Sequence, residues 1–181
     1  MKITRTSSLR DVAFVVCTAL HNGGIEAVLT GGSAATVYAP HACQSHDLDF
    51  IITFHTPQTD AGKILASLGY SVAGDHYEHA NNALVLEFPR GPLAIGRDLV
   101  EKWDTLREGS MILHIIRPTD SCRDRLAGFL FWNDRGSLDQ AVAVARARRK
   151  DVDVKVIRDW CRSEGKEDAF VAFERELSAA R

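Results

Sequence analysis

Acidic and large apolar residues alternate along the segment Asp47-Leu48-Asp49-Phe50, which continues into a further apolar stretch. Because successive side chains of a β-strand point to opposite faces, this pattern predicts a strand with both aspartates on one face. Two carboxylates on the same strand face repel each other unless a cation lies between them. A hard divalent ion such as Mg²⁺ suits this position, since it takes oxygen ligands and shares them with substrate phosphates.

A glycine turn precedes the acidic strand. Residues 25–30 form an apolar run that predicts a short buried strand, and Gly31-Gly32-Ser33 then leads into a short helix over 33–38. Backbone N–H groups exposed at the start of a helix form a natural site for phosphates. The spacer from Ser33 to Asp47 allows one short helix and a return into a neighbouring strand, which would bring the turn and the carboxylates to the same sheet edge. The alternative is a tight turn with a serine cap and no ligand.

Glu87 is the natural candidate for a third carboxylate. It belongs to a strand predicted over 83–88 and lies on the face opposite to the leucines of that strand. An isolated glutamate between large apolar neighbours is unexpected in a central strand, and a third acid would complete a two-metal site. The alternative is an edge strand whose polar face meets solvent. The direction of the Glu87 side chain therefore distinguishes an intact metal centre from a degenerate one.

The rest of the chain divides into a mixed first part and a helical second part. Apolar spacing predicts helices over 9–20 and 60–68 and a strand over 111–116, whereas 70–79 is strand or irregular and 92–110 has no clear pattern. After Pro118 the apolar period changes to that of helices, which are expected up to residue 132 and over 138–148, 153–163 and 168–177. We expect an α/β domain over 1–116, with a mixed sheet flanked by helices, followed by a helical C-terminal region over 117–181.

Composition excludes several classes of protein. The formal net charge of −2 gives no basic excess, which argues against extended nucleic-acid binding. The four cysteines are scattered without the spacing of a zinc site, which favours free thiols in a reducing cytoplasm. The apolar stretch 12–20 is too short to span a bilayer, and the first residues lack the apolar core of a signal peptide, so no membrane partner is expected.

The order of a hydrophobic strand, Gly-Gly-Ser, a spacer and Asp-Leu-Asp-Phe-Ile resembles the motif of the nucleotidyltransferase superfamily, with its polymerase-beta-like fold. The resemblance covers roughly residues 25–89 and is closest to small bacterial nucleotidyltransferases that are AbiEii-like or related and uncharacterised, some of which are toxins of toxin–antitoxin pairs. It implies transfer of a nucleoside monophosphate from an NTP to an RNA, protein or small-molecule acceptor, with Mg²⁺ or alternatively Mn²⁺ as cofactor. It also implies an antitoxin as a candidate partner.

The resemblance also implies roles for individual residues. The catalytic and metal-binding residues would be Asp47, Asp49 and Glu87, and the nucleotide-binding residues would be Gly31, Gly32, Ser33, Arg125 and Asp134. AbiEii-like proteins have a phosphate-binding lysine on the first helix of the helical part, where this chain offers Arg125 instead. Asp134 is the first choice for a later acid of the site, with Asp153 behind it, and a salt bridge with a neighbouring acid is the alternative role for Arg125.

Two other functions compete with the transferase. A degenerate relative of the same fold would bind a nucleotide or a partner protein without chemistry. A plain interaction module would use its acids only to keep a strand end soluble.

Overall fold

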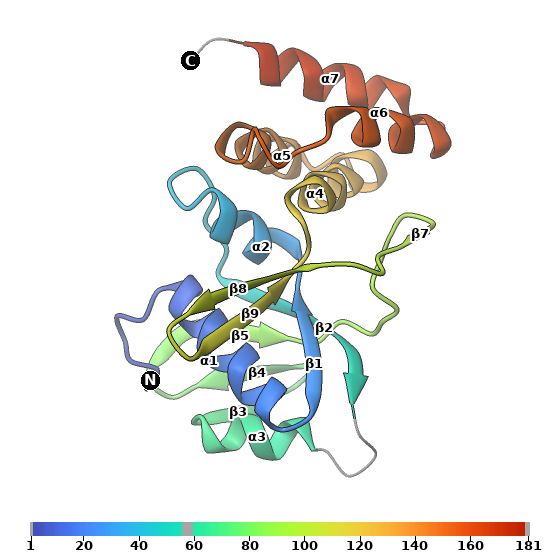
Figure 1. Cartoon of the computed structure of the whole chain (residues 1–181). Coiled ribbons are helices and arrows are strands. Elements are labelled where there is room, and N and C mark those ends of the chain that lie inside the picture. The colour runs from blue at the N-terminus through green and yellow to red at the C-terminus, as the bar shows by residue number, and fades with distance from the viewer. Residues whose placement is uncertain (1, 56–59, 180–181) are drawn as a thin grey trace.

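The computed structural model describes residues 2–55 and 60–179 (Figure 1). Within these ranges the chain forms seven helices and a mixed seven-stranded sheet with a separate two-stranded ribbon, followed by a C-terminal run of helices. The expected fold class, an α/β protein with a helical C-terminal region, is confirmed.

The elements have the following bounds. The helices are α1 (Leu9–Asn22), α2 (Gly31–Tyr38), α3 (Ala61–Ser67), α4 (Pro118–Trp132), α5 (Arg135–Ala147), α6 (Val154–Ser163) and α7 (Glu167–Ser178). The strands are β1 (Ile25–Leu29), β2 (Asp47–His55), β3 (Tyr70–Ala73), β4 (His76–His79), β5 (Asn82–Glu87), β6 (Ala94–Ile95), β7 (Asp98–Leu99), β8 (Asp104–Glu108) and β9 (Met111–Ile115).

The main sheet has the strand order β3-β4-β5-β2-β1-β9-β8. Strand β2 lies near its centre, antiparallel to β1 and parallel to β5. The parallel register sets Asp47 opposite Val85 and Asp49 opposite Glu87. The acidic residues of two strands that are distant along the chain thus become direct neighbours.

One face of the sheet is buried under α1, which packs on β1 and β9. Leu48 and Phe50 are fully buried, while Asp47 and Asp49 are only partly covered, as the alternation along this strand predicts. Phe50 also stacks on Phe88 with ring centroids 6.1 Å apart. The apolar face therefore holds β2 in place, and the acidic face is left for other contacts.

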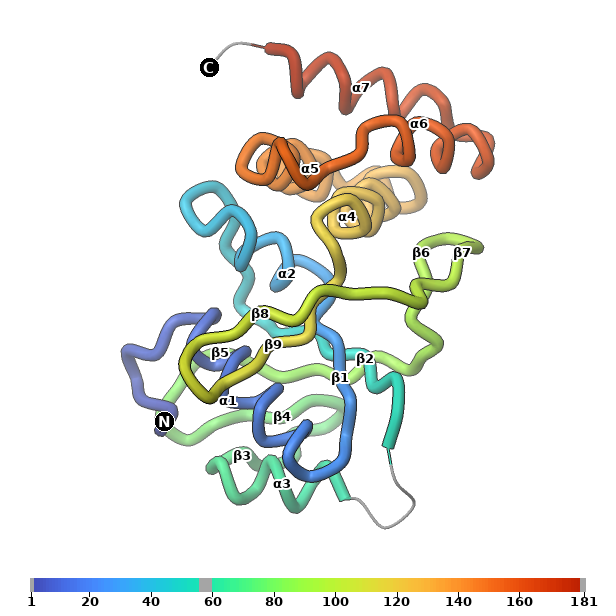
Figure 2. Tube along the Cα trace, viewed as in Figure 1, coloured from blue at the N-terminus to red at the C-terminus, as the bar shows by residue number. Residues whose placement is uncertain are grey.

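The C-terminal helices stack on α2 rather than on the sheet itself. Helices α4 and α5 pack on α2, and α6 and α7 cover them on the far side, so that Figure 2 shows four layers from the sheet to α7. The expected boundary between residues 116 and 117 falls in the link between β9 and α4. In the described part of the chain no helix is long and apolar enough to cross a membrane.

Some elements differ from the sequence-based predictions. Residues 70–79 form a regular hairpin, β3–β4, and the unassigned segment 92–110 contains the small ribbon β6–β7 and the edge strand β8. Helix α2 begins at Gly31, two residues earlier than predicted, and α5 begins at Arg135 rather than 138. All four cysteines are buried free thiols, which agrees with the expectation from their spacing.

Candidate metal centre

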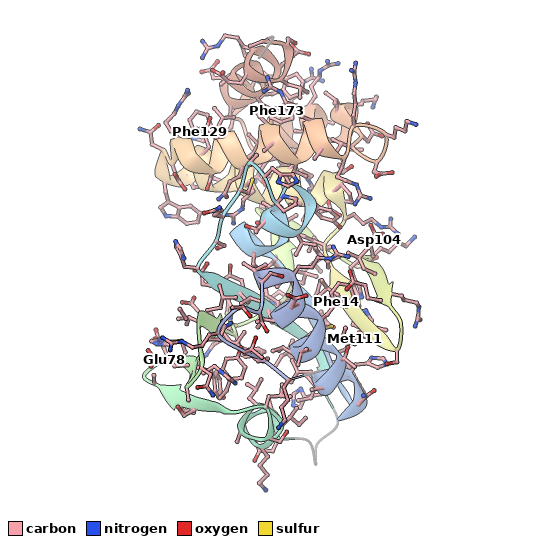
Figure 3. The ribbon with its side chains drawn as sticks, turned by 90° about the vertical axis from the view of Figure 1, so that its left-hand side faces the viewer. Phe14, Glu78, Asp104, Met111, Phe129 and Phe173 are labelled. Atoms are coloured by element: carbon pink, nitrogen blue, oxygen red, sulfur yellow. The ribbon has the colours of Figure 1, made fainter. Side chains whose placement is uncertain are left out.

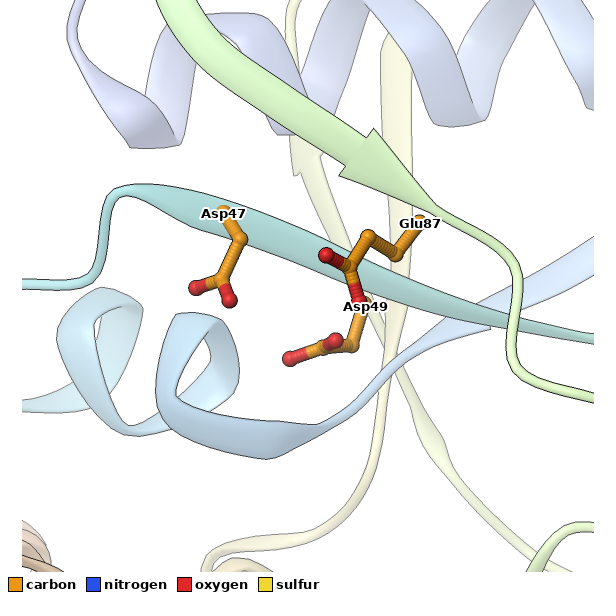
Figure 4. A group of neighbouring side chains, drawn as sticks. All are labelled: Asp47, Asp49 and Glu87. Carbon is orange, nitrogen blue, oxygen red and sulfur yellow. The ribbon is translucent and has the colours of Figure 1, made fainter. Parts of the chain in front are cut away.

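Three carboxylates meet on the polar face of β2 and β5. Asp47 and Asp49 project from β2, and Glu87 projects from the end of β5 toward them (Figure 4). One carboxylate oxygen of each residue lies within 4.8 Å of those of the other two. Glu87 therefore has the direction that an intact three-acid centre requires, rather than that of a solvated edge strand.

Burial and like charges dominate the electrostatics of this cluster. Burial, followed by the charges of Asp47 and Glu87, raises the pKa of Asp49 to about 6, and Arg125 opposes this shift. A carboxyl that is partly removed from water beside two like charges is destabilised in its ionised form. A divalent cation bound between the three groups would relieve this repulsion.

The start of α2 lies directly against Asp49. Gly31, its first residue, has a φ of +65°, and a Cβ atom at this position would collide with Asp49 Oδ2. Thr30, the N-cap residue, makes no side-chain hydrogen bond to the helix start. The first N–H groups of a helix have no partner in a preceding turn, and Gly31 brings this helix start against the Asp49 side chain.

Ser33 ties α2 to the acidic strand. Its fully buried hydroxyl donates to the Thr30 carbonyl at 2.7 Å and accepts from the Asp49 N–H at 3.2 Å. The Thr30 N–H in turn donates to the Asp49 carbonyl at 2.9 Å. The Ser33 hydroxyl, which the sequence suggested as a phosphate contact, is thus engaged in holding the helix start beside Asp49.

The helical region contributes a cationic group near the site. Arg125 of α4 forms an ion pair with Asp124 at 2.9 Å, so the salt bridge considered as its alternative role is present. The Arg125 guanidinium also donates to Gln140 of α5 at 3.5 Å. The Gln140 side chain lies 3.7 Å from the position that a Cβ atom would take at Gly32, so this group closes over the glycine turn.

Asp134 and Asp153 serve as helix caps in this structure. The Asp134 carboxylate accepts from the Gly136 N–H at 2.9 Å and from the Ser137 hydroxyl at 2.6 Å, and the hydroxyl bond lowers its pKa. Asp153 accepts from the N–H groups of the first turn of α6. Neither residue belongs to the carboxylate cluster that the described residues form.

Three further residues of the site were not anticipated. Ser45 donates to Asp47 Oδ1, but it lies before the start of β2, so the alternation of strand side chains gave no signal for this contact. Asp124 and Gln140 carried no such signal, since only the packing of α4 and α5 on α2 brings them here. A cavity of about 650 Å³ includes Ser45 and His46 in its lining, but none of the three carboxylates.

The donor set fits a hard divalent cation. Carboxylate oxygens are the ligands that Mg²⁺ and Mn²⁺ prefer, and the described residues place no thiol or imidazole in the cluster. Three partly buried acids beside open backbone donors can hold a cation and an anion side by side. Such a centre suits chemistry on a phosphate ester.

No protein-family model matches the chain, and a comparison with curated proteins finds no match. The case for a function rests on the geometry of the site.

Proposed function

We propose that the protein is a Mg²⁺-dependent nucleotidyltransferase, which moves a nucleoside monophosphate from an NTP to an RNA, protein or small-molecule acceptor. The observation that carries this proposal is the convergence of Asp47, Asp49 and Glu87 beside the start of α2. The free thiols favour a cytoplasmic location. An antitoxin is a candidate partner, as the resemblance to AbiEii-like proteins implies.

Each group would have a distinct task. The three carboxylates would hold Mg²⁺ or Mn²⁺, which supplies positive charge for the phosphates and lowers the pKa of an attacking hydroxyl. The N–H groups of Gly31 and Gly32 would donate to the β- and γ-phosphates, as helix starts do for anions. Arg125 would add positive charge from α4, and positioning with charge neutralisation would account for most of the catalysis.

The position of Glu87 supports the transferase over a degenerate relative. A binding module needs no third acid at the register position opposite Asp49, yet Glu87 occupies it and faces inward. A plain interaction module would leave its acids in open solvent. Asp49 is instead partly buried against the glycine turn, where its charge is unfavourable without a cation.

The test joins a binding measurement to an activity measurement. ATP, CTP, GTP and UTP are each added with Mg²⁺ or with a chelator, and the melting temperature is followed. Each isotope-labelled NTP is then incubated with cell extract, and RNA, protein and small-molecule fractions are counted. We expect Mg²⁺-dependent stabilisation by at least one nucleotide and transfer of label to one fraction.

A matched pair of variants localises the result. Glu87→Gln keeps the shape of the third acid but removes its charge, and should reduce transfer by about 100-fold. Glu78→Gln makes the same change on the exposed surface of β4 and should leave transfer unchanged. No stabilisation by any of the four nucleotides, together with no transfer, would refute the proposal and favour the interaction module.

A further inference from the structure

The hydroxyl of Thr36 connects helix α2 to the segment that leads into β2. Thr36 Oγ1 donates to the Gly32 carbonyl, one turn earlier, at 2.9 Å and accepts from the Ser45 N–H at 3.1 Å. Pairing of β2 with its neighbouring strands begins at Asp47, so Ser45 lies before the paired part of the strand. The bond from Thr36 therefore holds the backbone of Ser45 beside the helix.

Ser45 bonds in turn to the carboxylate cluster. Its hydroxyl donates to Asp47 Oδ1, and Figure 4 shows the Asp47 carboxylate pointing from β2 toward α2. The Ser45 Oγ atom also lies 3.2 Å from the position that a Cβ atom would take at Gly32, so it rests against the first turn of α2. Three hydrogen bonds, through Thr36 and Ser45, thus join the Gly32 carbonyl to one carboxylate oxygen of Asp47.

The segment between α2 and β2 runs back along the helix. Figure 3 shows it descending beside α2 before it enters β2. Its first part is held by the N–H groups of Ala42 and Cys43, which donate to the Ala39 carbonyl at 3.0 and 2.9 Å. Thr36 and Ser45 are both partly buried, and a hydrogen bond that is partly removed from water is stronger than one in open solvent. The link to Asp47 therefore belongs to a well-held part of the chain.

The two aspartates of the cluster are held in different ways by the same helix. The Ser33 hydroxyl of α2 accepts from the Asp49 N–H and so fixes the backbone of that residue. The Thr36 hydroxyl of α2 acts through Ser45 on the carboxylate of Asp47. The helix whose start would bind the phosphates thus sets the position of both aspartates.

A carboxylate that binds a metal ion is oriented by its other hydrogen-bond partners. Each of its oxygens can accept more than one bond, so the bond to Asp47 Oδ1 leaves room for a cation. Loss of such an orienting partner typically costs 10–100-fold in metal affinity or activity. Resting on the proposed function, we propose that Thr36 and Ser45 are positioning residues, which hold the Asp47 carboxylate in the orientation that binds the cation.

The binding of Mn²⁺ alone, followed by calorimetry, tests this proposal. Thr36→Val keeps the branched shape but removes the hydroxyl, and should weaken Mn²⁺ binding and lower the kcat of transfer by about 10-fold each. The KM for the NTP should change little, because the N–H groups of Gly31 and Gly32 remain. Thr36→Ser keeps a hydroxyl and should restore both Mn²⁺ affinity and kcat.

Thr18→Val is the matched control. The Thr18 hydroxyl of α1 also makes two bonds to the backbone, since it donates to the Ile112 carbonyl at 3.1 Å and accepts from the Ile112 N–H at 2.9 Å. Both valine variants should lower the melting temperature by a similar amount, but only Thr36→Val should weaken Mn²⁺ binding. Equal Mn²⁺ affinity in the two variants would overturn the inference, because the role of Thr36 would then be structural only.

A second variant keeps the test decisive if Thr36→Val does not fold. Ser45→Ala removes the last bond of the link and should weaken Mn²⁺ binding to the same extent. The double variant should be little worse than either single one, because both break one link, whereas full additivity would show separate actions and contradict it. Natural Mn²⁺ affinity in Ser45→Ala would overturn the inference and leave the transferase standing. A natural protein that neither binds Mn²⁺ nor transfers label would overturn the proposed function as well.

Discussion

Helices α2 and α5 begin in opposite ways. Asp134 caps α5 from within, since its carboxylate accepts from a backbone N–H and a hydroxyl of the first turn. The side chain of Thr30, the N-cap residue of α2, makes no such bond, and the acid beside Gly31 is Asp49 of β2. A side-chain cap satisfies backbone N–H groups at the start of a helix and so stabilises the fold. A helix start without such a cap keeps N–H groups that can donate to a ligand. The contrast separates an acid that caps a helix from the acids that we propose bind a cation.

The largest effect is expected from Asp49, the acid at the open helix start. Asp49→Asn keeps the shape but removes one charge from the cation site, and should lower transfer by at least ~100-fold. The melting temperature should also stop responding to Mg²⁺. Steady-state transfer assays and thermal unfolding measure both. Asp75→Asn, at a fully exposed position, is the control, and full activity in Asp49→Asn would remove Asp49 from the catalytic set.

Two glycines with nearly the same backbone test the close approach at Gly31. Gly31 and Gly74 have φ values of +65° and +67°, but only Gly31 has the Asp49 carboxylate where a Cβ would be. Both alanine variants suffer backbone strain of ~1–3 kcal/mol. Gly31→Ala should lose about 2 kcal/mol more in the free energy of unfolding, because of overpacking. Urea denaturation measures the difference, and equal losses would show that α2 moves away from β2 easily.

The raised pKa of Asp49 predicts a pH dependence for the metal-free protein. Its pKa is about 6 in the folded chain, against 3.8 as the usual value, so the folded state binds the proton more tightly. The free energy of unfolding should therefore fall as the pH rises from about 4 to above 6, by about 1–2 kcal/mol given partial exposure.

The comparison that isolates this effect is the natural protein minus Asp49→Asn, unfolded by urea in chelator across that pH range. Titrating groups away from the cluster, such as His114 with its pKa lowered by burial, cancel in the difference. Saturating Mg²⁺ should abolish the fall. A difference that does not change with pH would contradict the electrostatic account of the cluster.

The smallest effect is expected at the capped helix. Asp134→Ala should lower the free energy of unfolding by ~1 kcal/mol through loss of the cap, and Asp134→Asn should restore most of it. Nucleotide affinity should be the same in both variants when measured below their melting temperatures. A fall in affinity in Asp134→Asn, which keeps the cap, would return Asp134 to the nucleotide site and weaken the contrast between α2 and α5.

The three carboxylates could be predicted from the sequence, because each follows from a pattern within its own strand. The alternation of acidic and apolar residues along β2 predicts that Asp47 and Asp49 lie on one face. Glu87 is predicted as the third acid because it is a charged residue between apolar neighbours on β5. The parallel pairing that joins Asp49 to Glu87 completes the cluster, and both strands had been placed from their own periodicity. The helical periods likewise predicted four C-terminal helices.

The part that could not be predicted depends on tertiary packing. Asp124 and Gln140 reach the site only because α4 and α5 pack on α2, which no short pattern encodes. Asp134 illustrates the reverse case, since an acid before a helix looks the same in sequence whether it caps that helix or binds a ligand. The ribbon β6–β7 and the strand β8 were missed because their short, mixed segments have no clear period.

The buried Ser33 hydroxyl has a thermodynamic consequence. The hydroxyl donates to the Thr30 carbonyl at the start of α2 and accepts from the Asp49 N–H of β2. A movement of the helix start should therefore also move Asp49. Cation and triphosphate should then bind cooperatively, and the factor by which each improves the affinity of the other must be equal. Calorimetric titration in both orders would measure that factor, and Ser33→Ala should bring it closer to one.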